Sequence, residues 1–155
     1  MEETELPVRL AGRVIVLDPG DRILLFRYED PPPKGPHWAT PGGGLETGED
    51  FYAAACREVA EETGWTDVAV APSEVHQEET VQWAWADGAR RLVTQHDHYF
   101  AGRVGVEERP LGDVAAVHAG DGIRESRWWT RAELDATQEA VYPLGLADLI
   151  RAAPG

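Results

Sequence analysis

The chain opens with a regular alternation of apolar and polar positions, which predicts β-structure. Over residues 8–16, one set of alternate positions is much more apolar than the other, as in a strand with one buried face. A second run, residues 22–28, follows the segment Asp18-Pro19-Gly20-Asp21, where proline presets φ and glycine accepts a positive φ. Residues 8–28 are therefore predicted to form a hairpin, which leads into a proline-rich loop at residues 31–36.

The later part of the chain predicts further strands and one long irregular segment. Strands are expected over residues 67–71, 75–85, 91–104 and 123–129, with a hairpin turn at residues 86–89 and a short extended piece at residues 37–40. Residues 105–122 are rich in glycine, aspartate and alanine and show little periodicity. They are predicted to be a loop.

Helices are predicted from the signals at their ends. For residues 49–63, Thr47 is the expected N-cap and Gly64 stands where a glycine ends a helix. Thr130 and Glu133 form a second capping box that begins a short helix at Arg131, and residues 144–152 are the last predicted helix. With no internal repeat and no long linker, this order predicts an α+β or α/β/α architecture, with residues 1–155 as a single domain.

Composition and charge narrow the class of protein and its partners. The 155 residues carry 28 acidic and 14 basic side chains, a net charge of −14 that repels nucleic-acid backbones, so no nucleic-acid partner is expected. The one cysteine, Cys56, excludes an intrachain disulfide and a multi-cysteine zinc site. Residues 1–10 lack the apolar core of a signal peptide and no apolar run could span a membrane, so a cytoplasmic protein without a membrane partner is expected.

The most informative residues are three glutamates in the first predicted helix. Glu58, Glu61 and Glu62 stand at positions i, i+3 and i+4, so their carboxylates project from one face. Mg²⁺ and Mn²⁺ prefer such clusters of oxygen ligands. Arg57 can reach Glu61 one turn on, or Glu49 at the start of the helix, and orient the carboxylates. Taken alone, glutamates on one helix face more often form a solvated surface.

A longer set of residues has a fixed spacing along the chain: Gly43, Glu49, Arg57, Glu58, Glu61, Glu62 and Gly64. Their pattern resembles the signature of the Nudix hydrolase family, GX5EX7REUXEEXGU, in which U is a bulky apolar residue. The last U is usually aliphatic in the family and is Trp65 here, which concerns packing after the helix. With its flanks, such as Trp38-Ala39-Thr40-Pro41-Gly42-Gly43, the resemblance spans about residues 8–150 and implies an α/β/α sandwich with a mixed sheet. All seven fixed letters of the signature are present.

The resemblance also implies a chemistry, the hydrolysis of a nucleoside diphosphate linked to another group by a metal-activated water. The expected cofactor is Mg²⁺, with Mn²⁺ as a substitute, and the expected partner is a small nucleotide-type substrate. By the resemblance, Glu58 and Glu62 are the best metal ligands, with Glu61 and the Gly43 carbonyl as further ligands. Glu49 and Arg57 are the expected orienting residues, and Glu125 is a candidate distal base or an ordinary solvated residue.

Several other residues have both a functional and an ordinary interpretation. His96 and His98 share one face of a predicted strand, but a metal site there would need a third ligand that the sequence does not show. Cys56 is interpreted as an inert small apolar residue of the helix. Trp83 and Trp85 could stack on a nucleobase or simply pack, and the candidate phosphate contacts are Arg27, Arg90 and Arg91.

The sequence is also compatible with rival functions. A non-catalytic nucleotide-sensing module on the same fold is the main alternative, although it would have no need of three crowded carboxylates. An isoprenoid diphosphate isomerase would need a catalytic cysteine, which Cys56 does not resemble, and a purely structural protein would not respond to Mg²⁺. No motif outside the signature identifies the substrate. The apolar segment Val141–Ile150 would allow a homodimer, and a monomer is equally compatible.

Overall fold

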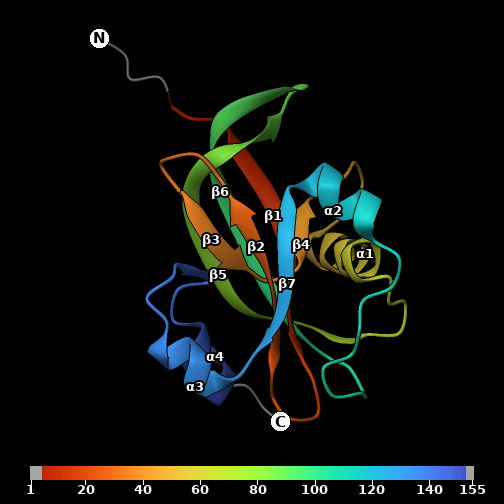
Figure 1. Cartoon of the computed structure of the whole chain (residues 1–155). Helices are drawn as coiled ribbons and strands as arrows, with labels where there is room; N and C mark the ends of the chain where they lie inside the picture. The colour runs from red at the N-terminus through yellow and green to blue at the C-terminus, as the bar shows by residue number, and fades with distance from the viewer. Residues whose placement is uncertain (1–4, 153–155) are drawn as a thin grey trace.

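The computed structural model describes residues 5–152, which form one curled eight-stranded sheet with helices on both sides (Figure 1). This arrangement confirms the predicted α/β/α sandwich with a mixed sheet. In chain order the elements are β1 (Val8–Leu17), β2 (Ile23–Glu29), β3 (Pro36–Ala39), β4 (Gly42–Gly44), α1 (Phe51–Thr63), β5 (Ala69–Ala86), β6 (Ala89–Arg103), α2 (Ala115–Asp121), β7 (Ile123–Trp129), α3 (Arg131–Ala136), β8 (Val141–Tyr142) and α4 (Leu146–Ala152).

The sheet is mixed because β1 has neighbours of both directions. Its strand order is β5-β6-β1-β2-β3-β8, with β4 paired to β1 and β7 paired to β2. β1 runs parallel to β6 along its whole length, but it meets β2 at a single register pair, Leu17 with Ile23. The predicted hairpin is therefore confirmed only at its turn. Beyond the turn β1 pairs instead with β4, through Ala11, Gly12 and Arg13.

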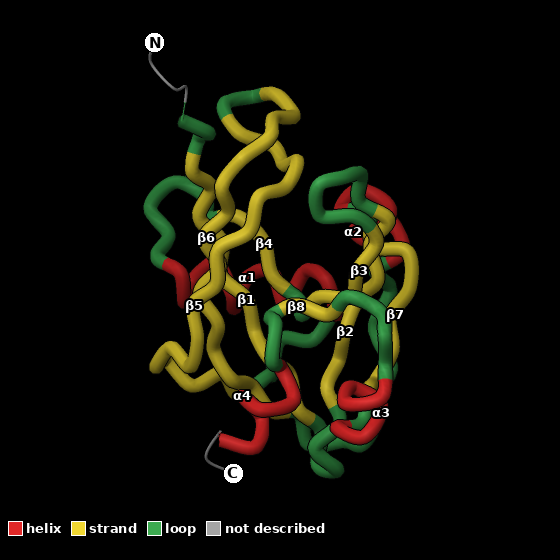
Figure 2. The backbone as a smooth tube through the Cα atoms, turned by 90° about the vertical axis from the view of Figure 1, so that its left-hand side faces the viewer, coloured by secondary structure: helices red, strands yellow, loops and turns green. Residues whose placement is uncertain are grey.

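The two faces of the sheet are covered by different helices, as two views at right angles show (Figures 1 and 2). Helix α1 packs on the face that carries Val14 and Phe26, whereas Leu146 and Ile150 of α4 pack on the opposite face with Ile15. Gly12 lets α1 approach β1, because a Cβ atom there would lie 2.1 Å from the Phe51 carbonyl oxygen. The alternation along β1 thus sends successive side chains into two separate cores.

Helix α1 begins two residues later than predicted, and its N-cap is Asp50 rather than Thr47. The Asp50 side chain accepts a hydrogen bond from the Ala53 amide at 2.8 Å. Gly48 has a φ of +82°, a left-handed conformation that cannot belong to the helix, so the first turn starts after it. The other end is confirmed, since Gly64 is left-handed and its N–H bonds to the Ala60 carbonyl.

Two further predictions needed correction. The predicted loop at residues 105–122 contains α2, a short helix with no buried residue and therefore no apolar periodicity to reveal it. The strands expected at residues 67–71 and 75–85 are one strand, β5, with register shifts around Glu74. Pro72 lies within β5, and a proline is tolerated there because β5 is at the edge of the sheet.

The remaining boundaries differ from the predictions by a few residues. Pro36, assigned to the loop, is the first residue of β3, and α4 begins at Leu146 rather than at residue 144. The capping box of Thr130 and Glu133 is present as predicted. Among residues 5–152, no helix is long and apolar enough to cross a membrane.

Candidate active site

Two of the predicted metal ligands project from α1 beside the glycine strand β4. The Glu62 side chain is buried and accepts a hydrogen bond from the Gly42 amide at 2.8 Å. Burial and the charge of Glu58 raise the pKa of Glu62 well above the usual range. Burial also raises the pKa of Glu58. A Cβ atom at Gly43 would lie 2.6 Å from the Glu58 carboxyl group, so a larger residue there would displace that carboxylate. Glu61, in contrast, is exposed.

A third carboxylate, Asp121, completes the group, and sequence reasoning did not find it. Oxygen atoms of Glu58, Glu62 and Asp121 all lie within 4.8 Å of one another. Asp121 is the last residue of α2, which is anchored to α1 because the His118 ring bonds to the Glu62 carbonyl oxygen at 2.7 Å. Since α2 lies in a segment without periodicity, no signal in the sequence pointed to this residue.

Arg57 connects the carboxylates of α1 to the preceding loop. Its guanidinium group donates two hydrogen bonds to Glu49, at 2.8 and 2.9 Å, and one to the Gly44 carbonyl oxygen at 2.9 Å. It also contacts Glu58 at 2.9 Å and the exposed Glu61 at 3.3 Å. A planar fork of this kind fixes the carboxylates more strictly than a lysine would. The structure thus brings Glu49, Arg57 and Glu58 into one contact network.

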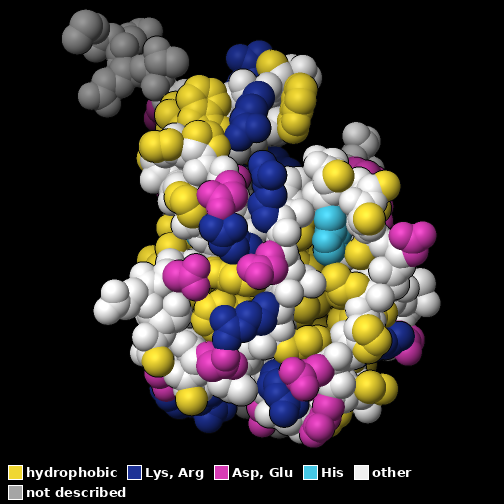
Figure 3. All heavy atoms as spheres, in the orientation of Figure 1, with side chains coloured by type: hydrophobic (Ala, Val, Ile, Leu, Met, Phe, Trp, Pro, Cys, Tyr) yellow, Lys and Arg dark blue, Asp and Glu magenta, His cyan; other side chains and the backbone are white. Residues whose placement is uncertain are grey.

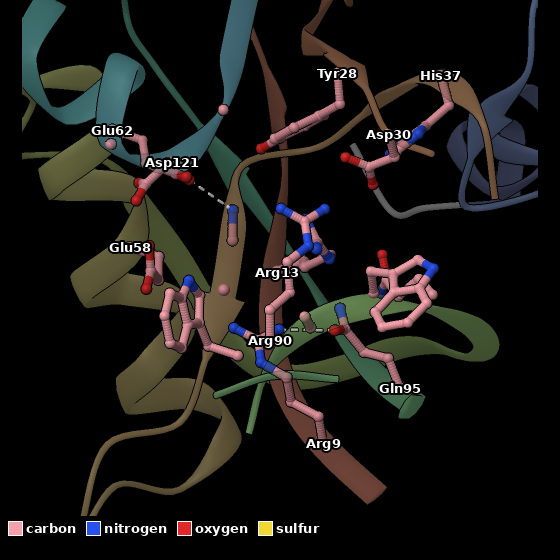
Figure 4. A pocket seen from close by; sticks show the side chains of 18 of the residues that line it. Arg9, Arg13, Tyr28, Asp30, His37, Glu58, Glu62, Arg90, Gln95 and Asp121 are labelled. Carbon is pink, nitrogen blue, oxygen red and sulfur yellow. Dashed lines mark hydrogen bonds between the residues drawn. The ribbon is translucent and has the colours of Figure 1, made fainter. Parts of the chain in front are cut away.

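The carboxylates of Glu58, Glu62 and Asp121 form one wall of a pocket of about 440 Å³ (Figure 4). The molecular surface is hollowed here, between the tip of the β5–β6 hairpin and α2 (Figure 3). In the close view Arg13 lies between the carboxylates and a second polar group formed by Asp30 and His37, and Arg90 is labelled below Arg13, near Arg9. The other lining residues are Arg9, Tyr28, Gly42, Gly43, Gln82, Trp83, Ala84, Trp85, Gln95, Ala119, Gly120 and Gly122.

The base of the pocket is held by a buried polar network. Arg13 donates hydrogen bonds to the Asp97 carboxylate at 2.6 Å and to the Thr40 carbonyl oxygen at 2.9 Å. Gln95 accepts from Arg9 at 2.7 Å and donates to Asp97 at 3.0 Å. Because Asp97 is buried and paired, the positive charge of Arg13 is held in place beneath the pocket.

The two strand histidines do not form a metal site. His98 stacks on Phe51, with ring centroids 3.5 Å apart, and its Nδ1 atom bonds to Glu74. His96 lies 3.5 Å from Glu79. Within residues 5–152, the one group of three or more close metal-ligating side chains is the Glu58, Glu62 and Asp121 cluster.

The remaining candidate site residues differ in whether they line the pocket. Glu125 is exposed and pairs in register with Arg27 on the face of the sheet opposite α1, outside the pocket. Arg27 pairs there with Glu29, and Arg91 donates to the Ala86 carbonyl oxygen at 3.1 Å, so neither lines the pocket. Trp83, Trp85 and Arg90 do line it. Half-buried Cys56 lies on α1 and is not among the lining residues.

Comparison with known proteins gives one family and one fold. The NUDIX domain family model matches residues 7–149. An RNA pyrophosphohydrolase from Caulobacter vibrioides is 30% identical over 141 residues, which cover 84% of this chain and 74% of that protein. The MutT protein from Methanosarcina mazei Go1 matches in structure with a TM-score of 0.66 and 19% identity, over 96% of this chain and 94% of that one. A C. elegans Ap4A hydrolase matches with a TM-score of 0.57 and 21% identity, over 93% and 94%.

The two solved structures, at this level of identity, support the fold. The family match goes further, because residues 7–149 include the whole loop and helix that carry the carboxylates. The Caulobacter relative also covers most of the chain. The chain therefore belongs to the NUDIX domain family, and it is a hydrolase of the pyrophosphate-cleaving type.

Proposed function

We propose that this hydrolase cleaves a small nucleotide-type substrate and uses Mg²⁺, or Mn²⁺ in its place, held by Glu58, Glu62 and Asp121. The observation that carries the proposal is the convergence of these three carboxylates within 4.8 Å at one wall of a pocket. Three anionic groups at such distances repel one another unless a cation lies among them. An all-oxygen donor set is the kind that Mg²⁺ and Mn²⁺ prefer.

The surrounding residues support this role. Arg57 orients Glu58 and, through its two bonds to Glu49, fixes the loop that leads into α1. We assign Glu61 and the Gly43 carbonyl to the rim of the same oxygen set, since Glu61 shares Arg57 and Gly43 lies against Glu58. A divalent ion bound here supplies charge neutralisation for phosphate oxygens and lowers the pKa of a water molecule.

The pocket also contains positively charged side chains that can contact the phosphate groups of an anionic substrate. Arg13 and Arg90 lie beside the carboxylate wall (Figure 4), where guanidinium groups can contact phosphate oxygens. Among the described residues, no carboxylate bonds to Arg90, so its charge is available to a ligand. Pyrophosphate groups would thus lie between the metal ligands and the arginines. The pocket volume of about 440 Å³ is suited to a small molecule.

The first test is product release from a panel of nucleoside triphosphates and nucleoside diphosphate derivatives, with Mg²⁺, Mn²⁺ or EDTA. We expect metal-dependent turnover, reduced at least about 100-fold by Glu58→Gln, Glu62→Gln or Asp121→Asn. Mn²⁺ binding by calorimetry should weaken in the same variants. Glu139→Gln, an exposed residue outside the pocket, removes the same charge and should keep full activity.

Three results would contradict the proposal. Turnover that persists in EDTA would exclude the metal role, and full activity of Asp121→Asn would remove that residue from the ligand set. Tight nucleotide binding without any turnover across the panel would favour a nucleotide-sensing module instead.

A further inference from the structure

The end of the pocket opposite the metal ligands contains a carboxylate that the hydrolytic chemistry does not use. Asp30 follows β2 directly and lines the pocket, on the side away from Glu58, Glu62 and Asp121 (Figure 4). Among residues 5–152 its carboxylate has no hydrogen bond and no ion pair. Burial raises the pKa of Asp30, while the charges of Lys34, Arg90 and Arg13 oppose this effect. A partly desolvated carboxylate without a partner is an acceptor of hydrogen bonds.

His37 presents a second acceptor at the same end of the pocket. Its Nδ1 atom lies 2.9 Å from the Gly35 carbonyl oxygen, which can only accept, so Nδ1 carries the hydrogen. The buried ring stacks on Tyr28 with centroids 5.3 Å apart, and burial lowers its pKa to about 4. The neutral ring therefore has Nε2 as an acceptor, and no described residue bonds to that atom.

Trp83 adds a flat apolar wall beside these acceptors. It lines the pocket from β5, and its indole N–H donates to the Pro32 carbonyl oxygen at 3.1 Å. The side chain nevertheless remains partly exposed, with 40% of the residue accessible. Its one polar atom is satisfied by the proline-rich loop, so the ring itself is what a ligand would meet. A nucleobase can stack on such a ring whatever its identity, because every base has a flat π-face.

We propose that this end of the pocket binds the nucleobase of the substrate, and that Asp30 selects a base with two adjacent N–H donors on one edge. The inference rests on the proposed function, which places the phosphates at the carboxylate wall. Guanine presents such an edge, with its ring N–H beside its exocyclic amino group, and a carboxylate can accept from both. Adenine and cytosine place an acceptor nitrogen beside their amino group, which would face the Asp30 oxygen unfavourably.

The test compares GTP, ITP and ATP, because hypoxanthine keeps the ring N–H of guanine but lacks its amino group. Dissociation constants are measured in EDTA by quenching of tryptophan fluorescence, and kcat/KM values in Mg²⁺. For the unmodified protein we expect GTP to be favoured over ITP by about 10-fold or more and over ATP by a larger factor. In Asp30→Asn the preference for GTP over ITP should fall to about 3-fold or less.

Asp87→Asn is the matched control, since it also removes one carboxylate. Asp87 lies at the exposed turn between β5 and β6 and does not line the pocket. The variant should keep the GTP preference unchanged. Equal weakening of all three nucleotides in Asp30→Asn, or equal affinity of GTP and ITP for the unmodified protein, would overturn the base-reading role. Because binding is measured without metal, a failure of hydrolysis would leave this comparison intact and would count only against the proposed reaction.

Discussion

At the scale of single residues, Trp65 explains the one departure from the family signature. Its indole N–H donates to the Pro110 carbonyl oxygen at 3.0 Å, and the Arg109 guanidinium lies over its ring at 5.0 Å from the centroid. An aliphatic side chain could make neither contact. The larger residue therefore ties the segment after β6 to the end of α1. Because α2 follows that segment, Trp65 helps to place Asp121.

His37 carries a pH prediction that belongs to the same scale. Its pKa is lowered to about 4 by burial, compared with an ordinary value of 6.5, so the unfolded chain binds the proton more readily. The neutral His37 ring therefore costs the folded protein no stability above about pH 6.5. As the pH falls from there towards about 4, the free energy of unfolding decreases, because the unfolded chain takes up the proton first. We expect the stability of the unmodified protein to fall more steeply over this range than that of His37→Phe. The difference should reach at most about 3 kcal/mol.

Urea unfolding of both proteins at a series of pH values measures this difference directly. Phenylalanine keeps an aromatic ring against Tyr28 but loses the hydrogen bond to Gly35. A constant offset between the two stability curves is thus the ordinary cost of the substitution. Curves that stay parallel from neutral pH down to about 4 would show that His37 does not titrate as a buried neutral group.

At the scale of elements, the packing of α1 on β1 determines where the carboxylates stand. A Cβ atom at Gly12 would lie 2.1 Å from the Phe51 carbonyl oxygen and 2.8 Å from the Ala55 amide nitrogen. Both atoms are helix backbone, which cannot rotate away as a side chain would. We expect Gly12→Ala to lower the free energy of unfolding by about 3 kcal/mol or more and to reduce turnover as α1 shifts. Denaturant melts and kcat measure the two effects.

Gly105→Ala is the control, because a Cβ atom at Gly105 meets nothing within 4 Å. Both changes remove the same backbone freedom from the unfolded chain, so their difference isolates the contact with α1. If Gly12→Ala proved as stable and as active as Gly105→Ala, the close packing of α1 on β1 would not be what positions Glu58 and Glu62.

The same elements show why the sequence predicted part of this site and not the rest. Helix α1 has an apolar face, a C-terminal glycine and a dense motif, so its position and its carboxylates could be inferred together. Helix α2 buries no residue, and its place depends on the contact of His118 with Glu62, which only the folded chain contains. Asp30 and His37 lie beside a proline-rich loop, where no periodicity exists. Long-range contacts, rather than local pattern, bring these residues to the pocket.

At the scale of the whole molecule, the negative net charge of the chain contrasts with the arginines that line the pocket. The chain carries a net charge of −14, and acidic and basic side chains are interleaved over the face seen in Figure 3. The pocket nevertheless contains three arginines, Arg9, Arg13 and Arg90. A small anion can contact these arginines without lying along the acidic exterior of the molecule. A long polyanion would in addition have to lie along the acidic exterior.

We therefore expect a mononucleotide triphosphate to be a better substrate than an RNA chain with the same terminal triphosphate. At about 20 mM salt the Debye length exceeds 20 Å, so repulsion by the net charge acts on many RNA phosphates; at about 300 mM it is largely screened. The ratio of kcat/KM values, mononucleotide over RNA, should thus decrease as salt rises. A dinucleotide with the same triphosphate end is the control, because it shares the terminus and carries little additional charge. Two results would contradict this prediction: a kcat/KM for RNA equal to that for the mononucleotide at low salt, or a kcat/KM for RNA that falls as salt is added, as counterion release would cause. Either would mean that RNA binds to a basic surface rather than being repelled by the acidic exterior.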